Sequence, residues 1–532
     1  MDFEKLGVMI DCSRNAVLNR EAFRRMAKLL AKLGYNTIRL YTEDTYEVDG
    51  EPYFGYLRGR YSKAELREMD SFAASLGIEL VPCIQTLAHL NSIFRYAEYG
   101  EIKDADDILL VGDERTYALI ENMFRSLAQC FTSRRVNIGM DEAFMLGKGK
   151  YLLKNGLVPS EKIMRAHLER VLAIAEKYGF SCEMWGDMFT RAAYGENETE
   201  FDRAEEVKKE VPENVTLVCW DYYHTDEAYF LNKIERYRKL SDRVNFAGGA
   251  WTWLGFCPNN DYSVKEIEAA VRACRKQGVK EVYFTMWGDN GGECSPFAVL
   301  PALVCGAEFA RGNFDMTSIK KRFREVVHEE FDLFCALDLP DKIYSTEKPD
   351  CCDPSKVLLY TDVFAGIYDK CVRENTAKPY YEALSDRLKA GENGEWGYLF
   401  RTVRALCDVL AVKFELGVVT RKLYRAGDKT ALAALANGAY TELLNRLEVF
   451  YEVYEACWAA EKKPHGFDVQ DARLGGLIRR IAHCKRRLLD YADGKTQSIP
   501  ELEEEILNPF GVQKPEGIAY NYYGALYTVN VP

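Results

Sequence analysis

The sequence predicts a (β/α)8 barrel, also called a TIM barrel, followed by an α-helical C-terminal domain. From residue 6 to about residue 312, short runs rich in β-branched residues alternate with amphipathic helical patterns. About eight such units fit this length, which is the number and size of a (β/α)8 barrel. After about residue 316 the strand-like runs stop, and apolar residues continue at helical spacing. We therefore expect a barrel domain over residues 1–315 and a helical domain with an extended tail over residues 316–532.

The eight expected strands share a short apolar core and a polar or aromatic end. They are LGVMID (6–11), NTIRLYT (36–42), GIELVPCI (77–84), RVNIGM (135–140), FSCEMW (180–185), VTLVCW (215–220), VNFAGG (244–249) and EVYFTMW (281–287). Several helical patterns between them end in glycine just before the next strand, the residue favoured after a helix C-terminus. A doubly wound open sheet is the alternative, but no GxGxxG follows the first strand, and eight units exceed what that fold usually needs.

Four long helical patterns follow the barrel. They cover residues 320–338, 395–424, 431–461 and 471–494. The Gly- and charge-rich segment 462–477 lies between two of these patterns, and it either packs against the barrel rim or reaches a partner subunit. The Pro-, Gly- and Tyr-rich stretch 508–532 predicts an extended tail.

Composition narrows the functional classes. The net charge is −12 and no basic block occurs, so neither nucleic acid nor an anionic membrane is an expected partner. The first residues carry no signal-peptide pattern, and the longest apolar stretch is too short to span a membrane. The 16 scattered cysteines include no CxxC, a pattern typical of reduced thiols in a cytoplasmic protein. Six separated histidines without HxH or HExxH indicate no metal site, and we expect no cofactor.

The active site of a (β/α)8 barrel lies at the C-terminal ends of the strands. There the sequence places Asp11 and Arg14, Glu43 and Asp44, Gln85 and His89, Asp141 and Glu142, Trp185 and Asp187, Trp220 to Tyr223, Trp251 and Trp253, and Trp287 and Asp289. Five of the seven Trp residues thus fall at expected strand ends. Aromatic faces stack on sugar rings and charged groups bind hydroxyls, so this set indicates a carbohydrate site.

The stretch VNIGMDEAF (136–144) delivers two adjacent acids, Asp141 and Glu142, at one strand end. Glycoside hydrolysis needs a general acid and a group that stabilises the oxocarbenium-like transition state. The seventh strand end, NFAGGAWTWLGF, offers no Glu for that second role. Neighbouring side chains diverge and cannot flank one bond as acid and nucleophile. They can serve a substrate whose own 2-acetamido oxygen attacks C1, with one acid orienting the acetamido N–H and the other protonating the leaving oxygen.

At these residues the sequence resembles glycoside hydrolase family 20, the β-N-acetylhexosaminidases. The resemblance covers residues 5–312, and the helical domain more loosely, and is nearest to the compact intracellular bacterial branch. The family's D-E pair after H-x-G-G reads N-I-G-M-D-E here, with Asn137 and Met140 as departures; Gln85 stands where an Asp is usual. The resemblance implies that Asp141 orients the acetamido group and that Glu142 is the general acid/base.

Further roles follow only from this resemblance. Arg14 would bind the O3 and O4 hydroxyls, and His89 would act as a relay supported by Glu43 or Asp44. Trp185 would line the acetamido pocket, and Tyr222, with Tyr223 as the alternative, would donate to the acetamido oxygen. The W-x-D pattern matches Trp287 and Asp289, with Asp289 on O4 and O6. Trp253 is placed on the aromatic rim by its position at the seventh strand end, independently of the resemblance. We interpret Asp187 and Asp221 as helix-cap or loop acids.

The expected activity is that of a retaining exo-β-N-acetylhexosaminidase acting on carbohydrates with a terminal 2-acetamido sugar, N-acetylglucosamine or N-acetylgalactosamine. One alternative is a glycosidase of another specificity with Asp289 as nucleophile. The other is a non-catalytic sugar-binding barrel. A homodimer through the helical domain is a further hypothesis.

Overall fold

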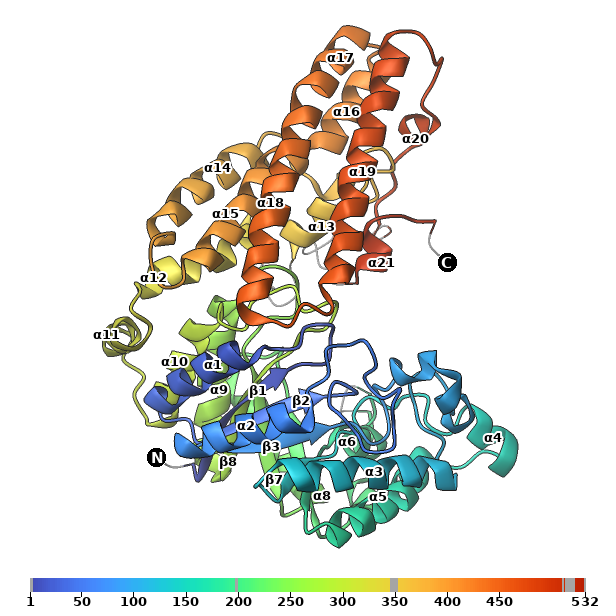
Figure 1. Ribbon diagram of the computed structural model, residues 1–532, viewed down its shortest axis with the longest axis vertical. Helices are drawn as coiled ribbons and strands as arrows, with labels where there is room; N and C mark the ends of the chain where they lie inside the picture. The colour runs from blue at the N-terminus through green and yellow to red at the C-terminus, as the bar shows by residue number, and fades with distance from the viewer. Residues whose placement is uncertain (1–2, 197–199, 345–352, 510, 512–521, 531–532) are drawn as a thin grey trace.

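The computed structural model describes residues 3–530, except 197–199, 345–352, 510 and 512–521. Eight parallel strands form a closed barrel in sequence order, with β1 pairing to both β2 and β8, which confirms the predicted fold (Figure 1). The strands are β1 (Lys5–Asp11), β2 (Thr37–Thr42), β3 (Glu79–Ile84), β4 (Arg135–Asn137), β5 (Ser181–Trp185), β6 (Val215–Trp220), β7 (Val244–Gly249) and β8 (Glu281–Met286). Each begins within two residues of its expected start, and β4 is shorter than expected because the chain turns at Gly139.

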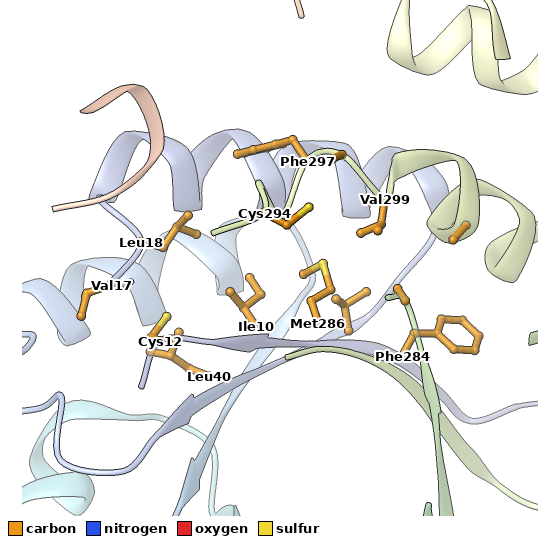
Figure 2. Packing of buried hydrophobic residues seen from close by; sticks show 14 of the residues in the cluster. Ile10, Cys12, Val17, Leu18, Leu40, Phe284, Met286, Cys294, Phe297 and Val299 are labelled. Carbon is orange, nitrogen blue, oxygen red and sulfur yellow. The ribbon is translucent and has the colours of Figure 1, made fainter. Parts of the chain in front are cut away.

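Alternate residues of each strand face the barrel interior and the surrounding helices. Met9, Tyr41, Cys83, Trp185, Val218, Ala247 and Tyr283 form one buried interior cluster. Their neighbours, such as Ile10, Leu40 and Phe284, belong to the larger core outside the sheet. Figure 2 shows these outward residues with Leu18 and Phe297, which come from segments flanking the helices that cover β1 and β8. The interior is therefore a packed core rather than a channel.

The helices of the barrel half are α1 (Arg20–Leu33), α2 (Lys63–Ser75), α3 (Glu114–Cys130), α4 (Lys150–Asn155), α5 (Ser160–Lys177), α6 (Asp187–Tyr194), α7 (Ala204–Val207), α8 (Glu227–Leu240), α9 (Asn260–Gln277) and α10 (Leu300–Ala310). Short 3-10 helices η1 (Ile93–Arg95), η2 (Ala97–Ile102) and η3 (Lys208–Glu210) lie in its loops. Local signals set several ends: the Asn19 side chain caps α1, and Ser62 and Glu65 form a capping box on α2.

The rest of the described chain is helical. It contains α11 (Met316–Val327), α12 (Phe331–Phe334), η4 (Cys335–Lys342), α13 (Pro354–Tyr360), η6 (Asp369–Cys371), α14 (Ala377–Leu388), η7 (Lys389–Gly391), α15 (Gly397–Lys413), α16 (Leu416–Arg425), α17 (Lys429–Asn437), α18 (Ala439–Glu461), α19 (Phe467–Ala492), α20 (Pro500–Glu503) and α21 (Tyr523–Leu526). These helices lie on the side of the barrel that α1 and α10 cover, with the long pair α18 and α19 side by side (Figure 1). No helix in the described ranges is long and apolar enough to cross a membrane.

Two predictions about the helical half can be compared directly with the structure. Much of the predicted extended tail lies outside the described residues, and its described part includes the short helix α21. The segment 462–477 packs against the barrel rim: Lys463 N donates to Val17 O at 2.7 Å, and Lys463 Nζ lies 2.9 Å from Glu65. The first of its two alternatives therefore holds. The domain boundary at residue 315 stays a prediction, since α11 packs against α1 and α10 of the barrel.

Candidate active site

One pocket opens at the C-terminal ends of the strands, with a cavity of about 110 Å³. Nine of the eleven predicted site residues line it: Arg14, His89, Asp141, Glu142, Trp185, Tyr222, Trp253, Trp287 and Asp289. Trp220 and Tyr223 also line it. Sequence reasoning put both of these at a strand end, and Tyr223 was the alternative to Tyr222. Glu43 and Asp44 do not line this pocket.

A strained turn after β4 presents the acidic pair. Gly139, Met140 and Glu142 adopt φ values of 74°, 72° and 52°, in the left-handed region. A Cβ on Gly139 would lie 2.1 Å from Gln85 Oε1, so only glycine fits there. Gln85 Oε1 also accepts a hydrogen bond from Met140 N at 3.1 Å. The turn therefore explains how two adjacent residues can both reach the pocket.

Asp141 is held on both carboxylate oxygens. Its Oδ1 accepts a hydrogen bond from Gln85 Nε2 at 2.7 Å, and its Oδ2 lies 3.3 Å from His89 Nε2. Burial raises the pKa of Asp141, but the charge of His89 and these hydrogen bonds outweigh burial and hold the pKa below its ordinary value. Asp141 is thus a fixed, charged carboxylate. Its side chain lines the pocket, where a substrate donor could reach the carboxylate.

Glu142 has the opposite character. Its side chain is 45% exposed at the pocket mouth, and its Oε2 lies 3.7 Å from His89 Nε2. Desolvation by the pocket wall and the charge of Asp141 raise the pKa of Glu142. The pair therefore combines a carboxylate that stays ionised with a carboxyl group that holds its proton to higher pH.

His89 joins the two acids, but its support differs from the prediction. Burial lowers its pKa, yet Asp141 and Glu43 outweigh burial and raise it to about 10. The residue that holds His89 is Asp107, whose Oδ2 accepts from His89 N at 3.0 Å and lies 3.7 Å from Nδ1. Asp107 follows His89 by 18 residues in a loop, and no sequence signal marked it.

Glu43 and Asp44, the predicted supports of His89, bind elsewhere. Glu43 Oε1 lies 3.0 Å from Arg14 Nη2, and Asp44 Oδ1 accepts from Arg58 Nε at 2.8 Å. Of the two alternatives, Glu43 acts on His89 only through its charge. Asp44 instead anchors the loop that contains Arg58.

Asp187 is not a helix-capping acid. Its Oδ2 accepts a hydrogen bond from Glu142 N at 2.9 Å, and its Oδ1 accepts one from Trp220 Nε1 at 3.4 Å. Burial and the charge of Asp141 raise the pKa of Asp187 to about 7. Asp187 therefore holds the backbone of Glu142 in its left-handed conformation. The interpretation of Asp221 as a loop acid agrees with its bonds to Tyr223 N and Lys233 Nζ.

Arg14 and Asp289 form the charged wall of the pocket. Burial lowers the pKa of Arg14, but Glu43, Tyr41 and the nearby acids raise it well above its ordinary value. Burial raises the pKa of Asp289 to about 6, although Arg14 opposes this shift. A cation and a carboxyl group on one wall suit the hydroxyl groups of a sugar.

Aromatic rings complete the pocket. Trp185 and Trp287 lie 5.8 Å apart between ring centroids, and Trp220 stacks on Tyr222 at 5.2 Å. Tyr222 contacts Trp253 edge-on at 5.5 Å, while Trp251 is buried behind Trp253. Within the described ranges, no group of three His, Cys, Asp or Glu side chains is arranged to hold a metal ion.

Comparison with known proteins gives relatives of low identity. The chain is 26% identical over 235 residues to Hexosaminidase D of Bos taurus, covering 42% of this chain and 63% of that protein. It is 22% identical over 203 residues to Hexosaminidase D of Homo sapiens, covering 36% and 40%. A Vibrio harveyi GH20 exo-β-N-acetylglucosaminidase, solved with N-acetylglucosamine, aligns with a TM-score of 0.48 and 16% identity over 63% of this chain and 58% of that chain. The chain thus spans less than two thirds of these relatives.

Two family models match, on either side of residue 300. Residues 3–236 match "Glycosyl hydrolase family 20, catalytic domain", and residues 332–519 match "Glycoside Hydrolase 20C C-terminal domain". The chain is thus a (β/α)8 barrel protein that is similar to glycoside hydrolase family 20 in both its barrel half and its helical half. The first match ends before β7, so Trp253, Trp287 and Asp289 are placed in the pocket by the structure alone.

Proposed function

We propose that the protein is a retaining exo-β-N-acetylhexosaminidase that removes terminal β-linked N-acetylglucosamine or N-acetylgalactosamine by substrate-assisted catalysis. The observation that carries the proposal is the pair of adjacent acids with opposite pKa shifts, lowered for Asp141 and raised for Glu142. Neighbouring carboxyl groups whose pKa values are driven apart are suited to different catalytic roles.

In the proposed first step the acetamido oxygen of the substrate attacks C1 and the glycosidic bond breaks. Asp141 accepts a hydrogen bond from the acetamido N–H and stabilises the positive charge of the oxazolinium ring. Glu142 donates its proton to the leaving oxygen. In the second step Glu142 takes a proton from water, which attacks C1 and restores the acetamido group with retained configuration.

The remaining pocket residues fit this substrate. Trp185, Tyr222 and Trp253 would enclose the acetamido group, and Trp287 would pack on the sugar ring. Arg14 and Asp289 would bind the ring hydroxyls at the non-reducing end, which limits the enzyme to terminal sugars.

Three finer points belong to this proposal and rest on the sequence. They are the kinship with the compact intracellular bacterial branch, the cytoplasmic location inferred from the cysteine pattern, and the homodimer. The curated relatives reported above come from cattle and human, so they do not bear on the first point.

The test is a side-by-side assay of the purified protein on nitrophenyl β-N-acetylglucosaminide, β-N-acetylgalactosaminide and plain β-glucoside. We expect turnover only of the two acetamido sugars, because the glucoside lacks the internal nucleophile. Glu142→Gln is the control: it should slow substrates with poor leaving groups by about 10²–10⁴-fold and activated aryl glycosides far less. Equal turnover of the glucoside would overturn the proposal in favour of Asp289 as nucleophile. No turnover of any sugar would favour a sugar-binding barrel.

A further inference from the structure

The segment that follows β8, residues 288–295, carries Asp289 into the pocket in a strained conformation. Asp289, Gly291 and Gly292 have φ values of 26°, 112° and 59°. A Cβ at Gly292 would lie 2.4 Å from Ala16 Cβ, so this backbone fits tightly against the first barrel loop. Strained backbone of this kind persists only when the surrounding structure holds it.

The barrel holds the start of this segment. Gly288 N donates to Asp11 Oδ2 at 2.9 Å, and Gly292 N donates back to Gly288 O at 2.9 Å. The segment also receives polar contacts from the helical region, from residues that lie more than 50 positions further along the chain.

Arg473 of α19 makes the densest set of these contacts. Its Nη1 donates to Asn290 O at 2.8 Å and to Glu293 Oε1 at 2.7 Å, and its Nη2 donates to Asn290 Oδ1 at 2.9 Å. The fork of one guanidinium thus joins the backbone next to Asp289 to an acid four residues further on. A planar guanidinium fixes geometry in a way that a lysine ammonium does not.

Other residues of the helical region contact the same segment. Lys356 of α13 pairs with Glu293 Oε2 at 2.7 Å, and Tyr454 OH of α18 donates to Glu293 O at 3.1 Å. Lys462 Nζ donates to Gly292 O and Cys294 O, and Gln470 Nε2 donates to Gly291 O. The side chains of Lys356, Glu293 and Arg473 are 1%, 2% and 10% exposed, so water cannot replace a missing partner.

We propose that Arg473 is a positioning residue for substrate recognition: together with Lys356, and through Glu293, it fixes residues 288–295 so that Asp289 faces the sugar. The helical region thereby completes the active site rather than only adding to the fold. This inference rests on the proposed function, since it takes Asp289 to bind hydroxyls of the terminal sugar.

The first test compares Arg473→Met with Arg480→Met. Arg480 lies on the same helix and pairs with Asp362 within the helical region, at 2.5 and 3.2 Å, so its loss removes a similar ion pair without touching the segment. For the folded fraction we expect Arg473→Met to lower kcat/KM about 10- to 100-fold, mainly through KM. Arg480→Met should stay within about twofold of the wild type. A comparable fall in both variants, or in neither, would overturn the proposal.

A double-mutant cycle separates positioning from general damage. In an Asp289→Asn background, Arg473→Met should add less than about a twofold further loss, because the group it positions is already impaired. Losses that multiply would contradict the proposal. Arg473→Lys keeps the charge toward Glu293 but not the fork, and should recover part of the kcat/KM. If Arg473→Met does not fold, Lys356→Met tests the same contact to Glu293.

Hydrogen exchange of residues 288–295 gives a readout that does not depend on turnover. If the wild type turns over no acetamido sugar, the proposed function fails, and exchange still decides whether the helices hold this segment. Faster exchange in Arg473→Met than in the wild type and Arg480→Met supports the proposal. Equal exchange in all three proteins overturns it.

Discussion

The two ends of the barrel both contain clusters of charge, and they use them differently. At the N-terminal ends of the strands, Arg39 is fully buried and binds Glu183 through Nε at 2.7 Å and Nη2 at 3.0 Å, and it also pairs with Glu281. Three basic groups meet three acidic ones there: Lys5, Arg39 and Arg135 with Glu79, Glu183 and Glu281. At the pocket end, Arg14 and His89 meet six carboxyl groups: Asp11, Glu43, Asp107, Asp141, Glu142 and Asp289. Asp187 adds a seventh next to Asp141 and Glu142.

This difference in balance explains the protonation states. Burial raises the pKa of Glu281, but Arg39 and Arg135 outweigh burial and lower the pKa to about 2. The cluster at the N-terminal ends of the strands therefore stays ionised. In the pocket, burial raises the pKa values of Glu43, Glu142, Asp187 and Asp289, and the nearby cations are too few to outweigh it. A balanced cluster supports the fold, whereas an acidic excess leaves groups that exchange protons near neutral pH.

The largest effect is expected from a substitution that breaks the charged cluster at the N-terminal ends of the strands. Arg39→Met leaves Glu183 and Glu281 buried with fewer partners, and it should lower the free energy of unfolding by about 3–5 kcal/mol. Denaturant unfolding measures this loss. The kcat/KM of the folded fraction should not change, since Arg39 lies away from the pocket. A loss below about 1 kcal/mol would mean that the cluster contributes little.

The next effect acts at the pocket end. Asp141→Asn removes the carboxylate that orients the acetamido group, and kcat on acetamido aryl glycosides should fall about 10²–10³-fold. The same change removes the main charge that raises the pKa of His89, so the imidazole, which titrates at about 10 in the wild type, should titrate lower. Enzyme assays and NMR titration of His89 measure the two outcomes. An unchanged His89 titration would contradict the assigned ion pair.

A smaller effect is expected on the pH dependence of stability, which tests the raised pKa of Asp187. The pKa of Asp187 is about 7 in the folded protein and 3.8 ordinarily, so the unfolded chain loses this proton first. Stability attributable to Asp187 is therefore full below about pH 4 and is lost as the pH rises toward 7. Asp187→Asn should match the wild type at pH 4 and exceed its stability at pH 8 by roughly 1–3 kcal/mol. A constant difference across this range would refute the raised pKa.

The smallest effect is the matched control for Arg39. Lys5 belongs to the same cluster but its side chain is 38% exposed and pairs with Glu79 at 2.9 Å. Lys5→Met should change the free energy of unfolding by only about 0–1 kcal/mol, because water screens an exposed pair. Denaturant unfolding beside Arg39→Met shows whether burial, rather than charge alone, sets the loss.

Much of the fold and most of the pocket lining could be predicted from the sequence. The short runs rich in β-branched residues and the glycines after helices are local signals, so each strand start is found within two residues. Because all eight strands are parallel, their carboxyl ends meet at one face, and reading strand ends selects residues such as Arg14, Asp141 and Asp289. The acidic pair and the Trp residues carry chemical meaning without any coordinates.

Only the tertiary structure decided which side chains are partners. Asp107, rather than Glu43 or Asp44, holds His89 through a hydrogen bond. Asp187 holds the backbone of Glu142, and Arg473 holds the segment of Asp289. These pairs come from different loops and, for Arg473, from the opposite half of the chain. Hydrogen bonds and pKa shifts depend on distances of a few ångströms and on burial, which no local pattern encodes. The sequence by itself therefore determined the barrel and the residues at the C-terminal ends of its strands. The tertiary structure decided which of these residues are ionised and which partners hold them in place.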